Sequence, residues 1–88
     1  MGEAIEVKII VYGHLKKVCG FESKTLFTPT DCGDAFRFVL SWLQENYGVE
    51  PNSVYLIFND KGANYKTYAG QRIKSGDVFK LMPVISGG

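Results

Sequence analysis

The sequence lacks most of the residue patterns that mark catalytic and metal-binding proteins. It contains one histidine, His14, and two cysteines, Cys19 and Cys32, which show neither C-x-x-C nor zinc-type spacing. One histidine and two cysteines are too few for a four-ligand zinc site or for the four cysteines of an iron–sulfur ferredoxin. No phosphate-binding G-x-x-x-x-G-K-S/T motif occurs. We therefore expect two free thiols, no bound cofactor or metal, and no active site belonging to this chain alone.

An excess of one charge and long apolar runs are also missing. Ten basic and nine acidic residues are scattered over the 88 residues and leave a formal net charge of +1. This balance favours neither a nucleic acid nor an anionic membrane as partner. No run approaches the ~18 apolar residues of a membrane span. The start MGEAIEVKII has no basic segment ahead of an apolar one, so we expect no signal peptide and a cytoplasmic location.

The apolar residues that are present change their period along the chain. Residues 5–12 place Ile5, Val7, Ile9 and Val11 on one face of a strand and Glu6, Lys8, Ile10 and Tyr12 on the other. Residues 21–28 alternate again, and the segment between the two runs is bounded by Gly13 and Gly20. Alternation of this kind is typical of half-buried strands, and two such runs around a glycine-bounded turn predict a hairpin. Pro29 is expected to end the second strand.

Helical spacing follows in residues 31–48. Asp31 is suited to the N-cap and Gly48 to the C-cap of this helix. Phe38 and Trp42, four residues apart, are expected on its flank, where they can touch. The side that faces the core is predicted to carry Ala35, Phe36, Val39, Leu40 and Leu43.

The last third of the chain returns to strands. The nearly unbroken apolar run over residues 54–58 predicts a strand with neighbours on both sides. A long loop follows, with one short strand expected near residues 65–68. A turn at residues 75–77 then leads into a final strand over residues 78–83.

This order of elements predicts an α+β fold. The first and last strands would lie parallel at the middle of a mixed sheet of four to five strands, with one helix packed across one face. At this length that arrangement is the ubiquitin-like β-grasp. The opposite face would have no second layer, which leaves Ile10, Tyr12, Leu81 and Met82 as candidates for a partner-binding surface. Scattered surface apolar residues with no role are the alternative interpretation.

The final stretch, GDVFKLMPVISGG, resembles the closing segment of the sulfur-carrier branch of ubiquitin-like proteins, the MoaD/ThiS family. Gly76-Asp77 stand at the turn before the last strand, Pro83 leads the tail, and Gly87-Gly88 finish it. The chain is most like MoaD, the small subunit of molybdopterin synthase. We therefore expect a β-grasp domain over residues 1–83 and a flexible tail over residues 84–88.

The resemblance implies that the tail carries the chemistry. In this family a partner related to ubiquitin-activating enzymes uses ATP to adenylate the C-terminal carboxylate, which would here be that of Gly88, and a sulfur donor such as a cysteine desulfurase supplies the sulfur of a thiocarboxylate. Gly87 and Ser86 would let the tail thread a narrow site, because small residues permit close backbone approach. The resemblance implies a further partner, a MoaE-like large subunit of molybdopterin synthase.

Three other functions stay open from the sequence. The chain could be a ubiquitin-like modifier that is conjugated to target lysines, as archaeal small modifiers are, or a sulfur carrier for thiamine or tRNA thiolation. The third reading is a β-grasp interaction module whose tail is inert. His14 is expected to be a solvated or capping residue of a turn. Asp60, Lys61 and Lys66 are expected to form a solvated charged connection that could also contact a partner.

Overall fold

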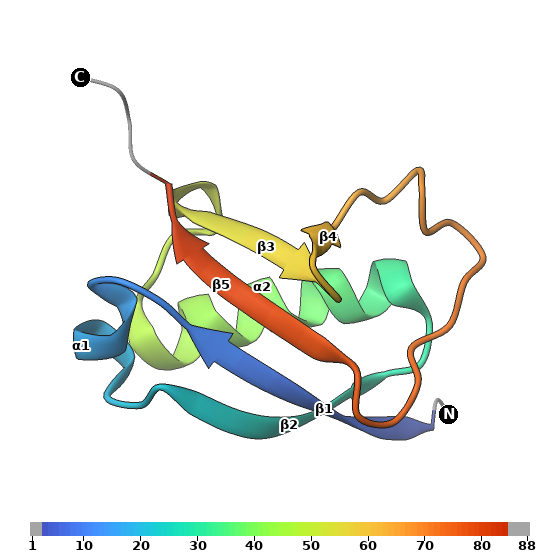
Figure 1. The fold of residues 1–88 in the computed structure, drawn as a ribbon, viewed down its shortest axis with the longest axis horizontal. Coiled ribbons are helices and arrows are strands. Elements are labelled where there is room, and N and C mark those ends of the chain that lie inside the picture. Colours follow the sequence, from blue (N-terminus) through green and yellow to red (C-terminus); the bar gives the residue numbers. More distant parts are fainter. Residues whose placement is uncertain (1–2, 85–88) are drawn as a thin grey trace.

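The computed structural model describes residues 3–84, which form a mixed sheet with α2 lying across one face (Figure 1). The strands are β1 (Ala4–Val11), β2 (Ser23–Pro29), β3 (Val54–Phe58), β4 (Lys61–Gly62) and β5 (Val78–Pro83). The helices are α1 (Leu15–Cys19), α2 (Cys32–Tyr47) and the 3₁₀ helix η1 (Pro51–Ser53). The strand order is β2-β1-β5-β3-β4, with β1 and β5 parallel and the other neighbours antiparallel. The α+β fold predicted from the sequence is confirmed.

Alternation along the central strands creates one buried and one open face of the sheet. In β1, Val7, Ile9 and Val11 are buried, whereas Glu6 and Lys8 are exposed. Successive side chains of a strand point to opposite faces, so the buried set packs against α2 and the other set faces away from it. Among the described residues, no helix or second sheet covers that other face, which we call the open face.

Phe36 of α2 lies at the centre of the core. Its ring centroid is 5.5 Å from that of Phe58 in β3, 5.8 Å from that of Phe79 in β5 and 5.6 Å from that of Tyr68. Tilted and edge-on ring pairs at these distances are favourable in addition to the burial of apolar area. Phe36 thereby joins the helix, two strands and the long loop after β4 into one core.

The predicted helix core is confirmed in its main part. The fully buried members are Ala35, Phe36, Val39 and Leu43, whereas Leu40 is only half-buried. Trp42 does pack at the edge of the core, but its aromatic neighbours are Phe21, at 6.2 Å between centroids, and Tyr47, at 5.5 Å.

Two local predictions were wrong. The segment between Gly13 and Gly20 is not a simple hairpin turn: it contains α1, which Gly20 ends with a left-handed φ of 80° and an N–H bond to the carbonyl of Lys16. No strand forms at residues 65–68, which are turns. The short strand is β4, because Asn59 and Asp60 both adopt positive φ values, 48° and 70°, and so make the tight connection that turns the chain back onto β3.

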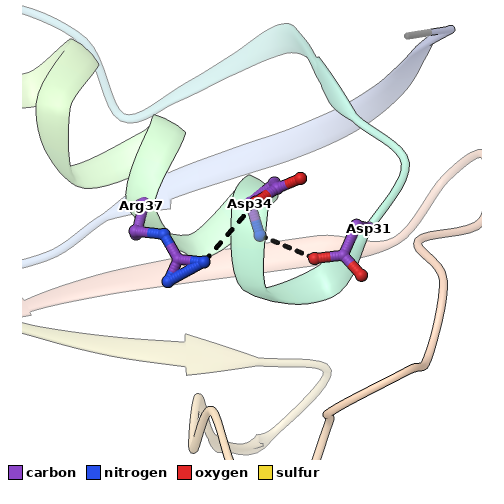
Figure 2. Close-up of polar contacts among 3 residues, drawn as sticks. All are labelled: Asp31, Asp34 and Arg37. Atoms are coloured by element: carbon purple, nitrogen blue, oxygen red, sulfur yellow. Dashed lines mark hydrogen bonds and ion pairs between the residues drawn. The ribbon is translucent and has the colours of Figure 1, made fainter.

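The N-terminus of α2 is stabilised by two neighbouring interactions (Figure 2). The carboxylate of Asp31 accepts a hydrogen bond of 3.0 Å from the backbone N–H of Asp34, as the N-cap prediction required. The Asp34 carboxylate lies 3.5 Å from Nη2 of Arg37, one turn further along the helix. Both carboxylates also face the positive end of the helix dipole. At the other end, Gly48 adopts the left-handed C-cap conformation that was predicted.

Within residues 3–84, no helix has the length and apolar character needed to cross a membrane.

We predict that Asp31→Ala lowers the free energy of unfolding by about 1 kcal/mol, because the N–H of Asp34 loses its acceptor at a helix terminus. Urea denaturation at neutral pH measures this change. Asp31→Asn is the matched control, since an amide oxygen can still cap the helix. A loss as large in Asp31→Asn as in Asp31→Ala would contradict a capping role.

Candidate functional site

The open face carries two rows of side chains that run across its three inner strands. In the first row, Met82 of β5 lies opposite Tyr55 of β3, and Tyr12, one residue past β1, flanks it on the other side. In the second row, Lys80 of β5 lies between Ile10 of β1 and Ile57 of β3. We call Ile10, Tyr12, Tyr55, Ile57 and Met82 the open-face patch.

Part of the apolar surface of the patch is exposed to solvent. Tyr55 is 61% exposed and Met82 is 38% exposed, while Ile10, Tyr12 and Ile57 are half-buried. Contiguous exposed apolar surface on a small domain is typical of sites that contact another molecule, so the patch is the candidate docking surface. Its members come from both ends of the sequence and from the middle, and they meet because β1, β5 and β3 are neighbours.

A single ion pair interrupts the apolar surface. The ammonium of Lys80 is hydrogen-bonded to the carboxylate of Asp60 in the β3–β4 turn. This hydrogen bond, with the charge of Asp60, raises the pKa of Lys80. Asp60, expected from the sequence to be part of a solvated loop, therefore contributes to the open face as the counter-ion of its central lysine.

The prediction that Leu81 belongs to a partner surface was wrong. Leu81 has no exposed surface and packs in the core, because its neighbours Lys80 and Met82 point to the open face and strand alternation turns Leu81 to the other side. Ile10, Tyr12 and Met82 do lie together on the open face. Tyr55 and Ile57 were not named from the sequence, although their spacing of two residues within a strand was the available signal.

The chain leaves the sheet beside the patch. Pro83 is the last residue of β5, and its ring lies beside Gly13, two residues past the end of β1. Val84 follows, and its N–H donates a 2.9 Å hydrogen bond to the carbonyl of Ser53 in η1. Strands β1 and β5 end on the same side of the sheet, and α1 lies on that side too (Figure 1). Ser86, Gly87 and Gly88, the predicted tail residues, lie outside the described part of the chain.

The other reactive side chains do not converge on a site. Cys19 and Cys32 are buried free thiols, and burial raises the pKa of both, with Asp31 and Asp77 adding to the effect at Cys32. His14 is exposed at the N-cap of α1, and its side chain caps nothing. Within residues 3–84, no three histidine, cysteine or acidic side chains lie close enough to hold a metal ion together.

Comparison with solved structures gives matches over the whole domain. The small archaeal modifier protein 1 of Methanosarcina acetivorans superposes with a TM-score of 0.71 at 18% identity, covering 99% of this chain and 100% of that one. The ubiquitin of Caldiarchaeum subterraneum gives 0.64 at 17% identity, covering 98% and 100%. Subunit 1 in the complex of subunits 1 and 2 of the molybdopterin-converting factor from Helicobacter pylori is similar at 0.57 and 24% identity, covering 96% and 100%.

No protein-family model matches the sequence, and no curated protein matches it significantly. The structural likeness therefore establishes the fold. The chain is a ubiquitin-like β-grasp domain, and the proteins with which it shares this fold include small modifiers and a subunit of the molybdopterin-converting factor.

We predict that both thiols react slowly with Ellman's reagent in the folded protein and rapidly after unfolding, because the reactive thiolate is disfavoured by burial. The raised pKa values also set the sign of a pH effect. The folded state retains thiol protons that the unfolded state has lost above the ordinary pKa of 9.0, so stability falls as pH rises beyond that value.

A Cys19→Ala/Cys32→Ala variant is the control for this pH effect, since it removes both thiols while leaving the other alkaline titrations. Urea denaturation between neutral and alkaline pH compares it with the natural sequence. Equal alkaline loss of stability in both proteins would contradict a contribution from the buried thiols.

Proposed function

We propose that this chain is a sulfur carrier whose C-terminal glycine, Gly88, is adenylated and then converted to a thiocarboxylate that donates sulfur in molybdopterin biosynthesis. The observation that carries the proposal is the junction of the open-face patch with the end of β5, from which the segment ending in Gly87-Gly88 continues. A carrier needs a docking surface close to the start of its C-terminal segment, because other proteins perform the chemistry and must bind the carrier while its C-terminus reaches their active sites.

The proposed reaction has two steps at one carbon atom. In the first, an oxygen of the Gly88 carboxylate attacks the α-phosphorus of ATP, so that pyrophosphate leaves and an acyl adenylate forms. In the second, hydrosulfide attacks the carbonyl carbon, forming the C–S bond and releasing AMP. A cysteine desulfurase would supply this sulfur as an enzyme persulfide, which a thiol reductant converts to hydrosulfide while the thiol is oxidised to a disulfide. Glycine suits both steps because it has no Cβ to hinder approach to its carbonyl.

This chain supplies binding and presentation rather than catalytic groups. The activating enzyme holds ATP, and a sulfur donor such as a cysteine desulfurase provides the sulfur. We propose that the open-face patch docks first on the activating enzyme and later on a large subunit that uses the thiocarboxylate. The Helicobacter pylori structure, in which a protein of the same fold is complexed with subunit 2 of its converting factor, supports a partner of that second kind.

The surface around the patch is suited to a partner with mixed polar and apolar contacts. Lys80 already has its counter-ion in Asp60, so a partner can cover the centre of the patch without supplying a carboxylate. Burying a paired charge costs much less than burying an unpaired one. Tyr12 and Tyr55 place aromatic rings at both sides of Met82, and aromatic residues are enriched where interfaces derive most of their binding energy.

Conjugation to lysines of target proteins is the second candidate, favoured by the structural likeness to an archaeal modifier and to a ubiquitin. The activation step is the same in both functions. They differ in the nucleophile that attacks the adenylate, directly or through an enzyme thioester: a sulfur donor in one case and a lysine amine in the other.

We predict that the protein, incubated with ATP, a cysteine desulfurase with cysteine, a thiol reductant and the activating enzyme of its own organism, gains the mass of one oxygen-to-sulfur exchange. Intact mass spectrometry measures the gain, and fragmentation locates it at Gly88. A variant without Gly88 is the control: it should stay unmodified while its melting temperature is nearly unchanged. Isopeptide links to target lysines without the sulfur exchange would favour the modifier function, and no change at all would overturn both.

We predict that Met82→Glu weakens binding to the activating enzyme by about tenfold or more, because it puts a charge into the middle of the apolar patch. Phe38→Glu is the matched control: Phe38 is 39% exposed, close to the 38% of Met82, but belongs to α2 in the other layer. Isothermal titration calorimetry compares the two. Equal loss of affinity in both variants would contradict docking through the open face.

A further inference from the structure

Because Gly13 has no side chain, the ring of Pro83 can lie close to its backbone. Gly13 follows the end of β1 and has a φ of 60°. A Cβ built on Gly13 would lie 3.1 Å from Cγ and 3.5 Å from Cδ of Pro83. The shorter distance is inside ordinary van der Waals contact, so any other residue at position 13 would push against the last residue of β5.

Hydrogen bonds hold the chain on both sides of this contact. The N–H of Tyr12 donates to the carbonyl of Leu81 at 3.0 Å, and the N–H of Val84 donates to the carbonyl of Ser53 at 2.9 Å. Ser53 is itself held, since its N–H and its hydroxyl both donate to the carbonyl of Glu50. Pro83 has no N–H to contribute and a nearly fixed φ, so the contact of its ring with Gly13 acts together with its pairing opposite Val54 and the two flanking bonds.

We propose that Gly13 is a positioning residue for the C-terminal segment: by admitting the Pro83 ring, it sets the direction in which the main chain leaves the sheet at Val84. This inference rests on the proposed function, because the direction matters only if the carboxyl group of Gly88 must reach a reaction centre on a docked partner. Gly88 lies four residues beyond Val84, so the position and direction of Val84 limit the region that the carboxyl group of Gly88 can reach. A misplacement of about 1 Å at a reacting group can slow a reaction by ~100-fold.

Gly20 provides a matched control for the backbone conformation. It stands at the other end of α1 with a φ of 80°, and a Cβ built on it would meet nothing within 4 Å. Alanine at either position suffers the penalty of a left-handed backbone. Only alanine at position 13 also presses on Pro83, so the difference between the two variants isolates that contact.

The test measures ATP-dependent adenylation of the full chain by the activating enzyme of its own organism. We expect Gly13→Ala to lower kcat by about tenfold or more relative to Gly20→Ala, with KM for the carrier within about twofold, since docking uses the open face. Gly13→Ala should cost no further activity when combined with Pro83→Ala, because the ring it presses on is gone. Equal kcat for Gly13→Ala and Gly20→Ala, or full additivity with Pro83→Ala, would overturn the proposal.

A second readout does not depend on the proposed function. Hydrogen exchange of the Val84 amide, followed by NMR, should be faster in Gly13→Ala than in Gly20→Ala, because the displaced Pro83 weakens the bond to Ser53. Should Gly13→Ala fold poorly, Gly13→Asn and Gly20→Asn replace the pair, since asparagine tolerates a left-handed backbone and still carries a Cβ. Absence of adenylation in the natural sequence would refute the proposed function, while equal Val84 exchange in the paired variants would refute the role of Gly13.

Discussion

The parallel pairing of β1 with β5 is the constraint on which the rest of the structure depends. It joins residues 8–11 to residues 78–81, nearly the full length of the chain apart, and places both strands at the centre of the sheet. Parallel strands need a long crossover, and here it contains α2, whose apolar side covers the sheet. Phe36 then packs against Phe79 of β5 and Phe58 of β3, so the pairing and the core support each other.

The same pairing builds the candidate site. Because β5 lies between β1 and β3, side chains that alternate outward from the three strands form one surface, with Met82 and Lys80 along its middle. Because β5 is the last described strand, this surface borders the place where the chain leaves the sheet at Val84. The open-face patch and the place where the chain leaves the sheet are thus neighbours for a topological reason, and this is the arrangement from which the carrier function is proposed.

Prediction from the sequence succeeded where local signals agreed with one another. The bounds of β3 and β5, the caps Asp31 and Gly48, and most of the α2 core follow from period and capping preferences. It failed at α1, whose five residues carry too short a pattern, and at β4, where two non-glycine residues adopt positive φ values. Leu81 was misplaced because an apolar strand read without its neighbours does not show which face is covered.

By itself the sequence determined α2, the four longer strands and their order, because periodicity, caps and glycines act over a few neighbouring residues. Only the tertiary structure decided which apolar residues became core and which became surface. In the folded chain Lys80 pairs with Asp60, which lies in a turn 20 residues earlier in the sequence. Pro83 lies beside Gly13, which is 70 residues earlier. These contacts depend on strand register and on the packing of α2, which long-range burial selects and local sequence does not encode.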